Sequence, residues 1–275
     1  MSANTPVAAF FDLDKTIIAT SSAFAFGKEF LHNGMITRQE AWDLYLSKAQ
    51  YMLVGQSSEK MDSTRDALAQ MVAGWEVDDI QRITRDTLRE VVAPAIYAEA
   101  RELIDAHRAK GHHIIIISAS AKILVEPIAQ ELGVDTVVAT EMAIENGKLT
   151  GEITRYLKGE AKAEAVRQFA ADHNFDLDAS FAYSDSATDI PMLELVGNPV
   201  AVNPDRALKK HALANGWQTR TFKNPEPLIQ MPNAREVGIG AGVIAGVTAL
   251  AVAGVLIARA VSGSGKGAGE KRRSA

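Results

Sequence analysis

Residues 10–18 read Phe-Phe-Asp-Leu-Asp-Lys-Thr-Ile-Ile, and they overlap an apolar run, 7–11, that predicts a short buried strand. Asp12 and Asp14 stand one residue apart where that strand ends, so both carboxylates can project into the same cleft. Two like charges this close repel each other, and the pair therefore needs a cation, a shared proton or a reaction that uses both. Mg²⁺ fits, because it binds carboxylate and carbonyl oxygens and usually keeps a phosphate group as a further ligand.

The same pattern, Asp-x-Asp-x-Thr, also suits a purely structural interpretation. A strand can end in a turn whose polar residues cap the next helix, and here Asp14 or Thr16 would accept hydrogen bonds from its first N–H groups. Three later segments of the sequence, in a fixed order, favour the chemical interpretation.

The second segment, 112–120, contains four consecutive isoleucines, Ile114 to Ile117. Such a run predicts a strand covered on both faces, as in a parallel α/β sheet. Ser118 lies at the carboxyl end of this strand, where open α/β sheets bind ligands, and its hydroxyl can donate to a phosphoryl oxygen. The structural alternative makes Ser118 the N-cap of a helix that begins near Ala121.

The third segment, 158–162, opens a helix that continues to Ala171, and it contains Lys158 and Lys162. The helix dipole prefers anions near a helix start, so a lysine in this place suggests a specific partner. The alternative is that both lysines are solvated on the exposed face of the helix.

The fourth segment, 181–192, predicts a strand that ends in two acids four residues apart, Asp185 and Asp189. The small residues between these acids let a loop wrap closely around an ion, and Asp185 supplies a further carboxylate for a metal. The alternative is an Asx turn followed by a helix whose N-cap is Thr188 or Asp189 and whose first turn holds Pro191.

Together, the four segments resemble the haloacid dehalogenase-like phosphatase superfamily, and most closely the branch that contains phosphoserine phosphatase. The resemblance covers about residues 7–205 and rests on Asp12-x-Asp14-x-Thr16, Ser118, Lys162 and Asp185-x-x-x-Asp189. It implies an α/β fold with a doubly wound, parallel, Rossmann-like sheet and an inserted helical cap. It also implies a Mg²⁺-dependent hydrolase of phosphomonoesters that works through an aspartyl-phosphate intermediate.

The resemblance also implies a role for each of these residues. Asp12 would be the nucleophile and Asp14 the general acid/base. Thr16, Ser118 and Lys162 would bind the phosphate group. The metal would be held by Asp12, the carbonyl of Asp14 and Asp185. Asp189 would order the metal site rather than bind the ion.

The tripeptide Asp14-Lys15-Thr16 is also similar to the phosphorylation signature of P-type transport ATPases. In that signature the sequence continues Gly-Thr, whereas Ile17-Ile18 follow here. A chain of 275 residues with one long hydrophobic stretch is also too small to form such a pump. We therefore set this interpretation aside.

The stretch between the first and second segments is far longer than a strand–helix connection needs. It predicts helices at 21–32, 37–54, 57–73 and 77–92, punctuated by Asn33-Gly34, Gly55 and Gly74. We expect this insertion to cover the catalytic face, where a lid excludes water and selects substrates; a helical subdomain without substrate contacts is the alternative.

The predicted domains are a catalytic core at 1–17 and 95–222, the cap at 18–94, a linker at 223–236, a hydrophobic helix at 237–258 and a basic disordered tail at 259–275.

Further strands are predicted at 199–202 and 219–222. The stretch 141–153, with Asn146-Gly147 at its centre, predicts a β-hairpin. Asp205 is expected to cap the helix that follows it.

One position departs from the phosphoserine phosphatase pattern. Those enzymes carry a glutamate nine residues after the nucleophile, which binds the amino group of the substrate, and this chain has Ser21 there. A neutral hydroxyl in place of a carboxylate argues against phosphoserine as the substrate, unless Glu29 or Glu40 reaches the site.

The composition limits the remaining classes of function. A net charge of −5 argues against nucleic acid as a partner, and the absence of cysteine excludes disulfides, zinc-thiolate sites and thiol catalysis. The N-terminus has neither a basic start nor a long apolar core, so no signal peptide is predicted. With 47% hydrophobic residues, the chain can fill a sizeable core.

The stretch from Val237 to Ala258 contains no charged residue and is long enough to cross a bilayer as a helix. Gly238, Gly242 and Gly246 recur at four-residue spacing, which can bring two such helices together, although richness in glycine and alanine explains the spacing equally well. We expect a membrane-anchored protein with its catalytic domain in the cytoplasm, and a lipid-borne phosphomonoester as a candidate substrate. The orientation of the segment is left open, because the positive-inside rule would keep the basic tail in the cytoplasm as well.

The sequence leaves other functions open. A soluble metabolite such as phosphoserine or histidinol phosphate can replace the lipid as the substrate. A phosphate-binding regulatory protein without turnover is a second class, although the complete acidic set argues against it. A phosphotransferase would share the aspartyl-phosphate, and nothing in the sequence separates transfer from hydrolysis.

Overall fold

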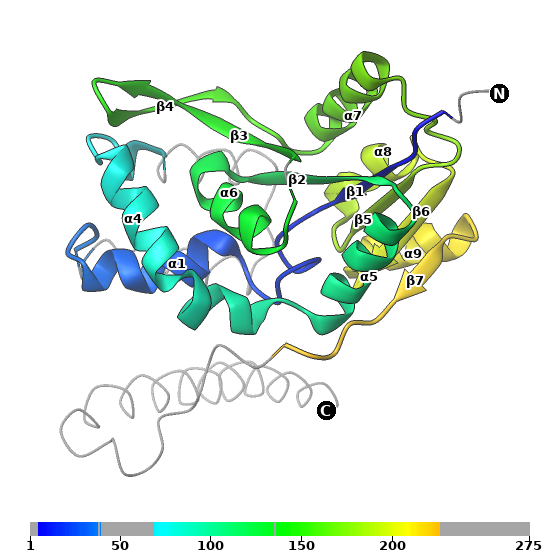
Figure 1. The fold of residues 1–275 in the computed structure, drawn as a ribbon, viewed down its shortest axis with the longest axis horizontal. Helices are drawn as coiled ribbons and strands as arrows, with labels where there is room; N and C mark the ends of the chain where they lie inside the picture. The colour runs from blue at the N-terminus through cyan, green and yellow to red at the C-terminus, as the bar shows by residue number, and fades with distance from the viewer. Residues whose placement is uncertain (1–4, 38, 40–68, 135, 226–275) are drawn as a thin grey trace, which may run out of the picture. The chain divides into compact units, whose positions relative to one another are not determined.

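A mostly parallel sheet organises the residues that the computed structural model describes, which are 5–37, 39, 69–134 and 136–225 (Figure 1). All neighbouring strands are parallel except for one antiparallel pair, β3 and β4, at one edge of the sheet. The predicted α/β class is therefore confirmed. In spatial order the seven strands are β4 (Lys148–Arg155), β3 (Thr136–Glu145), β2 (His113–Ala121), β1 (Ala8–Phe11), β5 (Phe181–Ser184), β6 (Asn198–Val202) and β7 (Gln218–Arg220).

The strand order reverses beside β1, which lies between β2 and β5. The chain runs outward from β1 to β4, returns across the sheet, and continues from β5 to β7 on the other side. At such a switch point the loops that leave neighbouring strands diverge, and ligands bind in the crevice between them. Because Asp12 follows β1 and Asp185 follows β5, two of the predicted motifs meet at this crevice.

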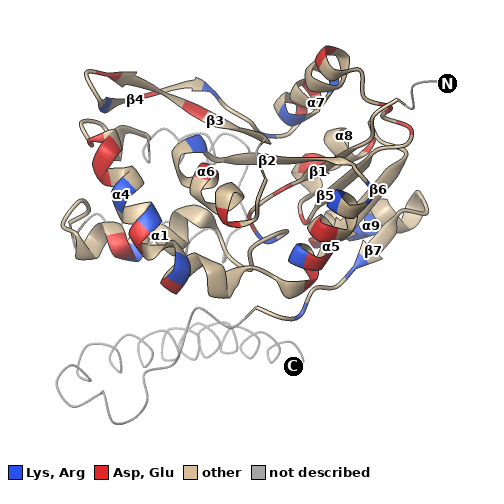
Figure 2. Ribbon diagram, in the orientation of Figure 1, with Lys and Arg blue, Asp and Glu red and all other residues tan. Residues whose placement is uncertain are grey.

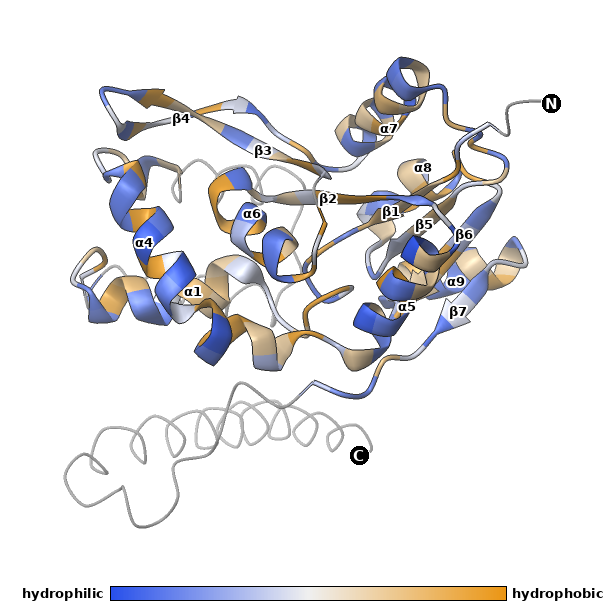
Figure 3. Cartoon of the chain, viewed as in Figure 1, coloured by the Kyte–Doolittle hydropathy of each residue, from blue (hydrophilic) through white to orange (hydrophobic). Residues whose placement is uncertain are grey.

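The alternation of side chains along β1 explains why helices cover both faces of the sheet. Phe11 joins the hydrophobic cluster on one face and Phe10 joins the cluster on the other, and each is 1% exposed. Burial of one such ring stabilises the fold by about 1.5–3 kcal/mol. The central strands are accordingly largely hydrophobic in Figure 3, whereas Figure 2 shows charged residues along the helices around them. The helices are α1 (Ser22–His32), α4 (Val77–Thr87), α5 (Ala98–Ala109) and α6 (Lys122–Glu131) on the face of Phe11, and α7 (Glu160–His173), α8 (Ile190–Leu193) and α9 (Arg206–Ala214) on the face of Phe10.

The strand β3 pairs with a different partner in each half. Residues 136–140 pair in parallel with β2, and residues 141–145 pair antiparallel with β4. Asn146 (φ 51°) and Gly147 (φ 80°) form the turn in the left-handed conformations that a two-residue hairpin requires. The predicted hairpin is thus confirmed. Its parallel half is not evident in the sequence, because the strong turn signal conceals the shorter apolar run before it.

The chain leaves the sheet after β1 and returns beside the point of exit. Ile18 and Ile96 form an antiparallel bridge, and the N–H of Ala19 donates to the carbonyl of Ala95 at 2.8 Å. Between these points the structure describes α1 and α4, and then a π-helix, η1 (Leu88–Val92), and a 3₁₀ turn, η2 (Ala93–Ala95). The helices predicted at 37–54 and 57–73 lie largely outside the described residues. The division into core and cap remains a prediction.

The expected membrane-anchored localisation is corrected by the structure. Within the described ranges, no helix combines the length and the apolar character that a bilayer span requires. The span predicted at 237–258, with its glycine spacing and the basic tail at 259–275, lies outside the described residues. The anchored localisation is therefore withdrawn, and the lipid-borne substrate loses the reasoning that suggested it.

Candidate active site

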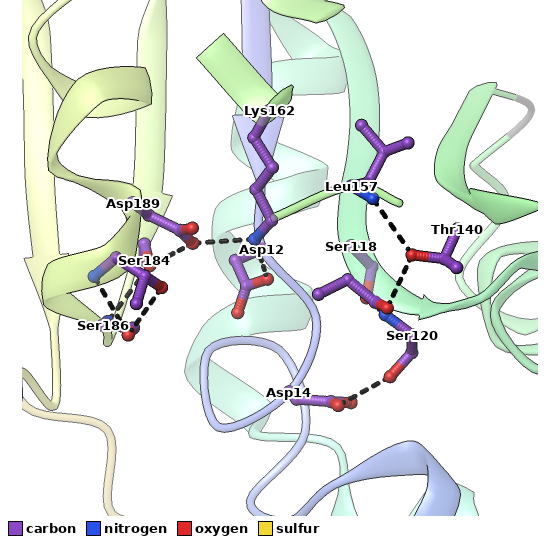
Figure 4. A network of polar contacts seen from close by, with 12 residues as sticks. Asp12, Asp14, Ser118, Ser120, Thr140, Leu157, Lys162, Ser184, Ser186 and Asp189 are labelled. Atoms are coloured by element: carbon purple, nitrogen blue, oxygen red, sulfur yellow. Dashed lines mark hydrogen bonds and ion pairs between the residues drawn. The ribbon is translucent and has the colours of Figure 1, made fainter. Parts of the chain in front are cut away.

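The carboxyl ends of β1, β2 and β5 carry most of the predicted site residues (Figure 4). Asp12 directly follows β1, and its backbone N–H donates to the carbonyl of Tyr183 in β5 at 2.9 Å. This bond extends the pairing of the two strands by one residue and fixes the backbone of Asp12. Asp12 is buried, so its carboxylate depends on neighbouring protein groups rather than on bulk water.

Lys162 reaches Asp12 from the first turn of α7. Its Nζ lies 2.6 Å from Oδ1 of Asp12 and 2.7 Å from Oδ2 of Asp189, and the lysine side chain is 3% exposed. Ser184, the last residue of β5, donates to the same Oδ2 of Asp189 at 2.7 Å. Lys162 is thus paired with two buried carboxylates, and the alternative of a solvated surface lysine does not apply to it.

These three groups place one positive and two negative charges where water is largely excluded. Burial raises the pKa of Asp12 to about 7; Lys162 opposes this rise, and the negative charge of Asp189 adds to it. Burial also disfavours the charged form of Lys162, but the two carboxylates outweigh that effect and raise the pKa of the lysine above its usual range. The cluster therefore keeps its lysine charged, and a further cation bound beside Asp12 would favour the ionised form of that carboxylate.

Asp185 adds a third carboxylate at the end of β5. Burial raises the pKa of Asp185 to about 6, an effect that Lys15 opposes and Asp189 strengthens. Across the part of the chain that is described, no three acidic, histidine or cysteine side chains converge as a metal cluster of their own. The predicted set needs only Asp12 and Asp185 as carboxylate ligands, because its third ligand is the backbone carbonyl of Asp14. Oxygen donors of this kind suit Mg²⁺, which keeps water or phosphate oxygens in its other positions.

Asp14 is oriented by neutral donors. Its Oδ1 accepts a hydrogen bond from the N–H of Ser22, the first residue of α1, at 2.9 Å, and its Oδ2 accepts from Oγ of Ser120 at 2.8 Å. Oγ of Ser22 donates in turn to Oγ of Ser120 at 2.8 Å. Asp14 therefore does bind the start of α1, as the structural interpretation expects, but it uses only one of its two oxygens for this.

The other two predicted phosphate-binding residues, Ser118 and Thr16, are both buried. Oγ of Ser118 accepts from the N–H of Ser120 at 3.1 Å, a contact that uses a lone pair and not the hydroxyl proton. Ser118 does not cap α6, whose N-cap residue is Ala121. Oγ1 of Thr16 has no hydrogen-bond partner among the described residues, a condition that costs about 1–3 kcal/mol unless a ligand or water satisfies it.

Asp205 supports the loop that carries Asp185 and Asp189. Its Oδ1 caps α9 by accepting from the N–H of Leu208 at 2.8 Å, and its Oδ2 accepts from the N–H of Ala187 in the loop at 2.9 Å. The sequence predicts the cap on α9. It does not predict the contact between Asp205 and Ala187, because these residues follow two different strands. Asp189 is the N-cap residue of α8 and Pro191 lies in its first turn, as the structural alternative expects. The Asp189 side chain, however, makes no capping hydrogen bond and pairs with Lys162 instead.

Sequence reasoning misses three serines of this site, Ser22, Ser120 and Ser184. Serine is common in turns and helix caps, and a single serine therefore carries little information. Two spacings could have indicated them. Ser184 directly precedes Asp185, and Ser120 follows Ser118 by two residues, which places both side chains on one side of an extended strand.

Several known proteins have sequences similar to this chain. The haloacid dehalogenase-like hydrolase family matches residues 9–194. A probable phosphatase of Mycobacterium tuberculosis strain H37Rv is 43% identical over 254 residues, which are 91% of this chain and 88% of that protein. A phosphoserine phosphatase of the same strain is 34% identical over 246 residues, with 86% and 79% covered. A histidinol-phosphatase of Neisseria meningitidis serogroup C is 28% identical over 225 residues, with 78% and 98% covered.

A solved structure shows the same architecture. It is the crystal structure of a Bordetella pertussis protein of unknown function, with 26% sequence identity and a TM-score of 0.70, and the match covers 79% of this chain and 99% of that one. The family match spans more than half of the chain and contains all four sequence segments described above. The chain therefore belongs to the haloacid dehalogenase-like hydrolases, in the branch that resembles phosphoserine phosphatases.

Proposed function

We propose that this protein is a Mg²⁺-dependent phosphatase that hydrolyses a small phosphomonoester through an aspartyl-phosphate on Asp12. The observation that carries the proposal is the contact between the buried carboxylate of Asp12 and the buried, charged Lys162, at 2.6 Å, beside the switch point of the sheet. The carboxylate alone would repel an anionic phosphate group. The lysine offsets that repulsion at the place where the two must meet.

In the first displacement, a carboxylate oxygen of Asp12 attacks phosphorus and the bond to the leaving oxygen breaks. Negative charge spreads over the equatorial phosphoryl oxygens, and Lys162 and the hydroxyl of Ser118 donate hydrogen bonds to them. Lys162 is already held by Asp189, which Ser184 holds in turn. Its charge therefore needs little reorganisation when the substrate reacts.

Asp14 performs the proton transfers in this proposal. It protonates the leaving oxygen in the first displacement, and in the second it takes a proton from the water that attacks phosphorus. The second displacement releases phosphate and restores the carboxylate of Asp12.

Asp12, the carbonyl of Asp14 and Asp185 would hold Mg²⁺, and Asp189 would order the site through Lys162. Bound there, the ion would neutralise charge on the phosphoryl group and lower its repulsion with Asp12. The raised pKa values of Asp12 and Asp185 support this assignment, because a bound cation would offset the cost of ionising the two carboxylates.

The helices beside the site form part of the proposal. Ser22 opens α1 and contacts Asp14, so a segment of the predicted cap reaches the catalytic residues. Ser21, the N-cap residue of α1, is half-buried and neutral where phosphoserine phosphatases carry a carboxylate. Phosphoserine and histidinol phosphate, which the names of two relatives indicate, both contain an amino group. We expect phosphomonoesters without an amino group to be preferred over both.

The test is phosphate release from an aryl phosphate by the full-length protein. We expect turnover that requires Mg²⁺, stops on chelation and is lost in Asp12→Asn. Phosphoserine, histidinol phosphate and amine-free phosphomonoesters would then be compared by kcat/KM. Absence of turnover in a folded, Mg²⁺-binding protein would favour a phosphate-binding regulatory protein, and phosphorylated products in the presence of added alcohols would indicate a phosphotransferase.

A further inference from the structure

Both oxygens of the Asp14 carboxylate are held by the protein, and the two donors come from distant parts of the chain. Oδ1 is bound by the N–H of Ser22 in α1, and Oδ2 is bound by the hydroxyl of Ser120 at the end of β2. An aspartate rotates easily about its last side-chain bond. Two donors are therefore needed to fix the plane of the carboxylate, and Ser120 provides the second one.

The hydrogen bonds of this group run in one direction. Ser120 has a single hydroxyl proton, and it donates this proton to Oδ2 of Asp14. Oγ of Ser120 accepts from Oγ of Ser22 at 2.8 Å, and Ser22 is 0% exposed, so bulk water does not compete for its hydroxyl. The side chain of Ser22 thus acts on Asp14 through Ser120.

The backbone that carries Ser120 is also held in place. The pairing of β2 with β3 shifts register just after Ser118, and irregularities of this kind re-aim side chains near active sites. Oγ1 of Thr140 donates to the carbonyl of Ala119 at 2.7 Å and accepts from the N–H of Leu157 at 3.2 Å, which fixes the irregular segment from the side (Figure 4). The hydroxyl of Ser120 therefore has a defined direction, toward Asp14.

We propose that Ser120 is a positioning residue for Asp14, which it holds in the orientation that meets the leaving oxygen of the substrate. The proposal rests on the proposed function, in which Asp14 protonates that oxygen. Without the hydroxyl, Asp14 keeps its contact with the N–H of Ser22 but can rotate about it. Proton transfer then becomes less efficient, while Lys162 and Ser118 still bind the phosphoryl group.

The acidity of the leaving group makes this role measurable. A strongly acidic phenol leaves as an anion without help, whereas a weakly acidic phenol needs a proton during bond breaking. Loss of a positioned acid therefore lowers kcat/KM most for weakly acidic phenols. A residue that only stabilises the fold would lower kcat/KM for every substrate by the same factor.

The experiment measures kcat/KM of the full-length protein, with saturating Mg²⁺, for aryl phosphates whose phenols range from strongly to weakly acidic. The variants are Ser120→Ala, Ser120→Thr, which keeps a hydroxyl, and Asp14→Asn as the limiting case. The matched control is Ser180→Ala, because Ser180 is also buried and its Oγ accepts from the N–H of Ala8 at 3.0 Å, at the start of β1.

We expect Ser120→Ala to lose about 10–100-fold for the weakly acidic phenols and less than about threefold for the most acidic one. Ser120→Thr should recover most of the loss, and Ser180→Ala should change all substrates equally. An equal loss across the series in Ser120→Ala would overturn the positioning role. If Ser120→Ala does not fold, Ser22→Ala decides in the same way, because it removes the hydroxyl that orients Ser120 and keeps the N–H that binds Asp14.

The controls separate this proposal from the proposed function. If the unmodified protein hydrolyses none of the aryl phosphates, or if Asp12→Asn retains turnover, the proposed function fails and the role of Ser120 fails with it. If the unmodified protein hydrolyses the aryl phosphates and Asp12→Asn does not, and only the selective loss in Ser120→Ala is missing, the proposed function stands and the role of Ser120 alone is rejected.

Discussion

Two polar clusters flank β1, and they are stabilised in opposite ways. The charged cluster, at the carboxyl end of the strand, consists of Asp12, Lys162 and Asp189. The histidine cluster lies on the face of the sheet that α5 covers and consists of His107, His112 and Tyr183. In it, Nδ1 of His107 lies 2.8 Å from Nδ1 of His112, and Nε2 lies 2.8 Å from the hydroxyl of Tyr183.

Burial shifts the pKa values of Asp12 and His107 in opposite directions, and in each case toward the neutral form. It raises the pKa of Asp12 to about 7, and it lowers the pKa of His107 to about 4, with smaller contributions from His112 and Lys110. The histidine cluster is thus stable in its neutral form. It lies among aromatic rings, and the ring centroid of Phe181, for example, is 4.7 Å from that of His107. The charged cluster keeps ions in a place where ions are costly, which is typical of a functional site, whereas the histidine cluster is typical of a core.

The largest expected effect is on kcat, and it comes from Lys162→Met, which removes the cation of the charged cluster. We expect kcat to fall by about 10²–10³-fold, because a fixed donor to the transferring phosphoryl group is lost. The control is Lys148→Met, which breaks an exposed ion pair with Glu76 at 2.9 Å and should leave kcat within about twofold. Steady-state kinetics measure both, and equal rates in the two variants would show that the charged cluster has no catalytic role.

A substitution in the histidine cluster should affect stability instead. His107→Phe keeps a ring in the core but leaves the buried hydroxyl of Tyr183 without its partner, so we expect a loss of about 2–3 kcal/mol in the free energy of unfolding. The kcat of the folded protein should stay within about threefold. Urea unfolding gives the first quantity, and His173→Phe, at an exposed position, is the control. A large fall in kcat with unchanged stability would reverse the roles of the clusters.

A smaller effect is expected in the pH dependence of stability of the metal-free protein. Between pH 4 and 6.5 the unfolded chain binds more protons at His107 than the folded protein does, so this residue makes stability rise with pH. Between pH 3.8 and 7 the folded protein binds more protons at Asp12, so that residue makes stability fall as pH rises. Each slope is at most about 1.4 kcal/mol per pH unit, and the two partly offset each other.

Single variants should separate these slopes. Asp12→Asn removes the falling contribution, so its unfolding free energy should rise from pH 4 to pH 6.5 more steeply than that of the unmodified protein. His107→Phe should show the opposite change. Urea titrations across this range, with chelator present, measure both slopes, and identical slopes in the two variants would contradict the pKa assignments.

The charged cluster is far more predictable from the sequence than the histidine cluster or the serines around Asp14. Asp12, Lys162 and Asp189 belong to segments whose residue types and strand context are chemically unusual, and the fold brings the three within hydrogen-bonding distance. His107 stands in an amphipathic helix among charged residues. Only a contact with Tyr183, 76 residues away in the sequence, reveals that it is buried.

The fold is predictable where local pattern and burial agree. The isoleucine run of β2 is one example, because its apolar pattern and its burial both favour a strand inside the sheet. The Asn146-Gly147 turn is another, because these residue types suit the left-handed conformations that the exposed turn adopts. The parallel half of β3 depends on its neighbour in the sheet and has little local signal. The anchored localisation is the clearest error, because it rested on the length and hydropathy of 237–258 and on a glycine spacing that composition explains equally well.

The central claim is that Asp12 carries the phosphoryl group during turnover. In Asp14→Asn the loss of the base should slow hydrolysis of the intermediate, while an aryl phosphate with an acidic phenol can still phosphorylate Asp12. The measurement is mass spectrometry of this variant after acid quenching during turnover. We predict one added phosphoryl group, located on Asp12 and absent when Asp12→Asn is combined with Asp14→Asn. A phosphoryl group on another residue, or an unmodified Asp12 together with turnover by Asp12→Asn, would contradict the claim.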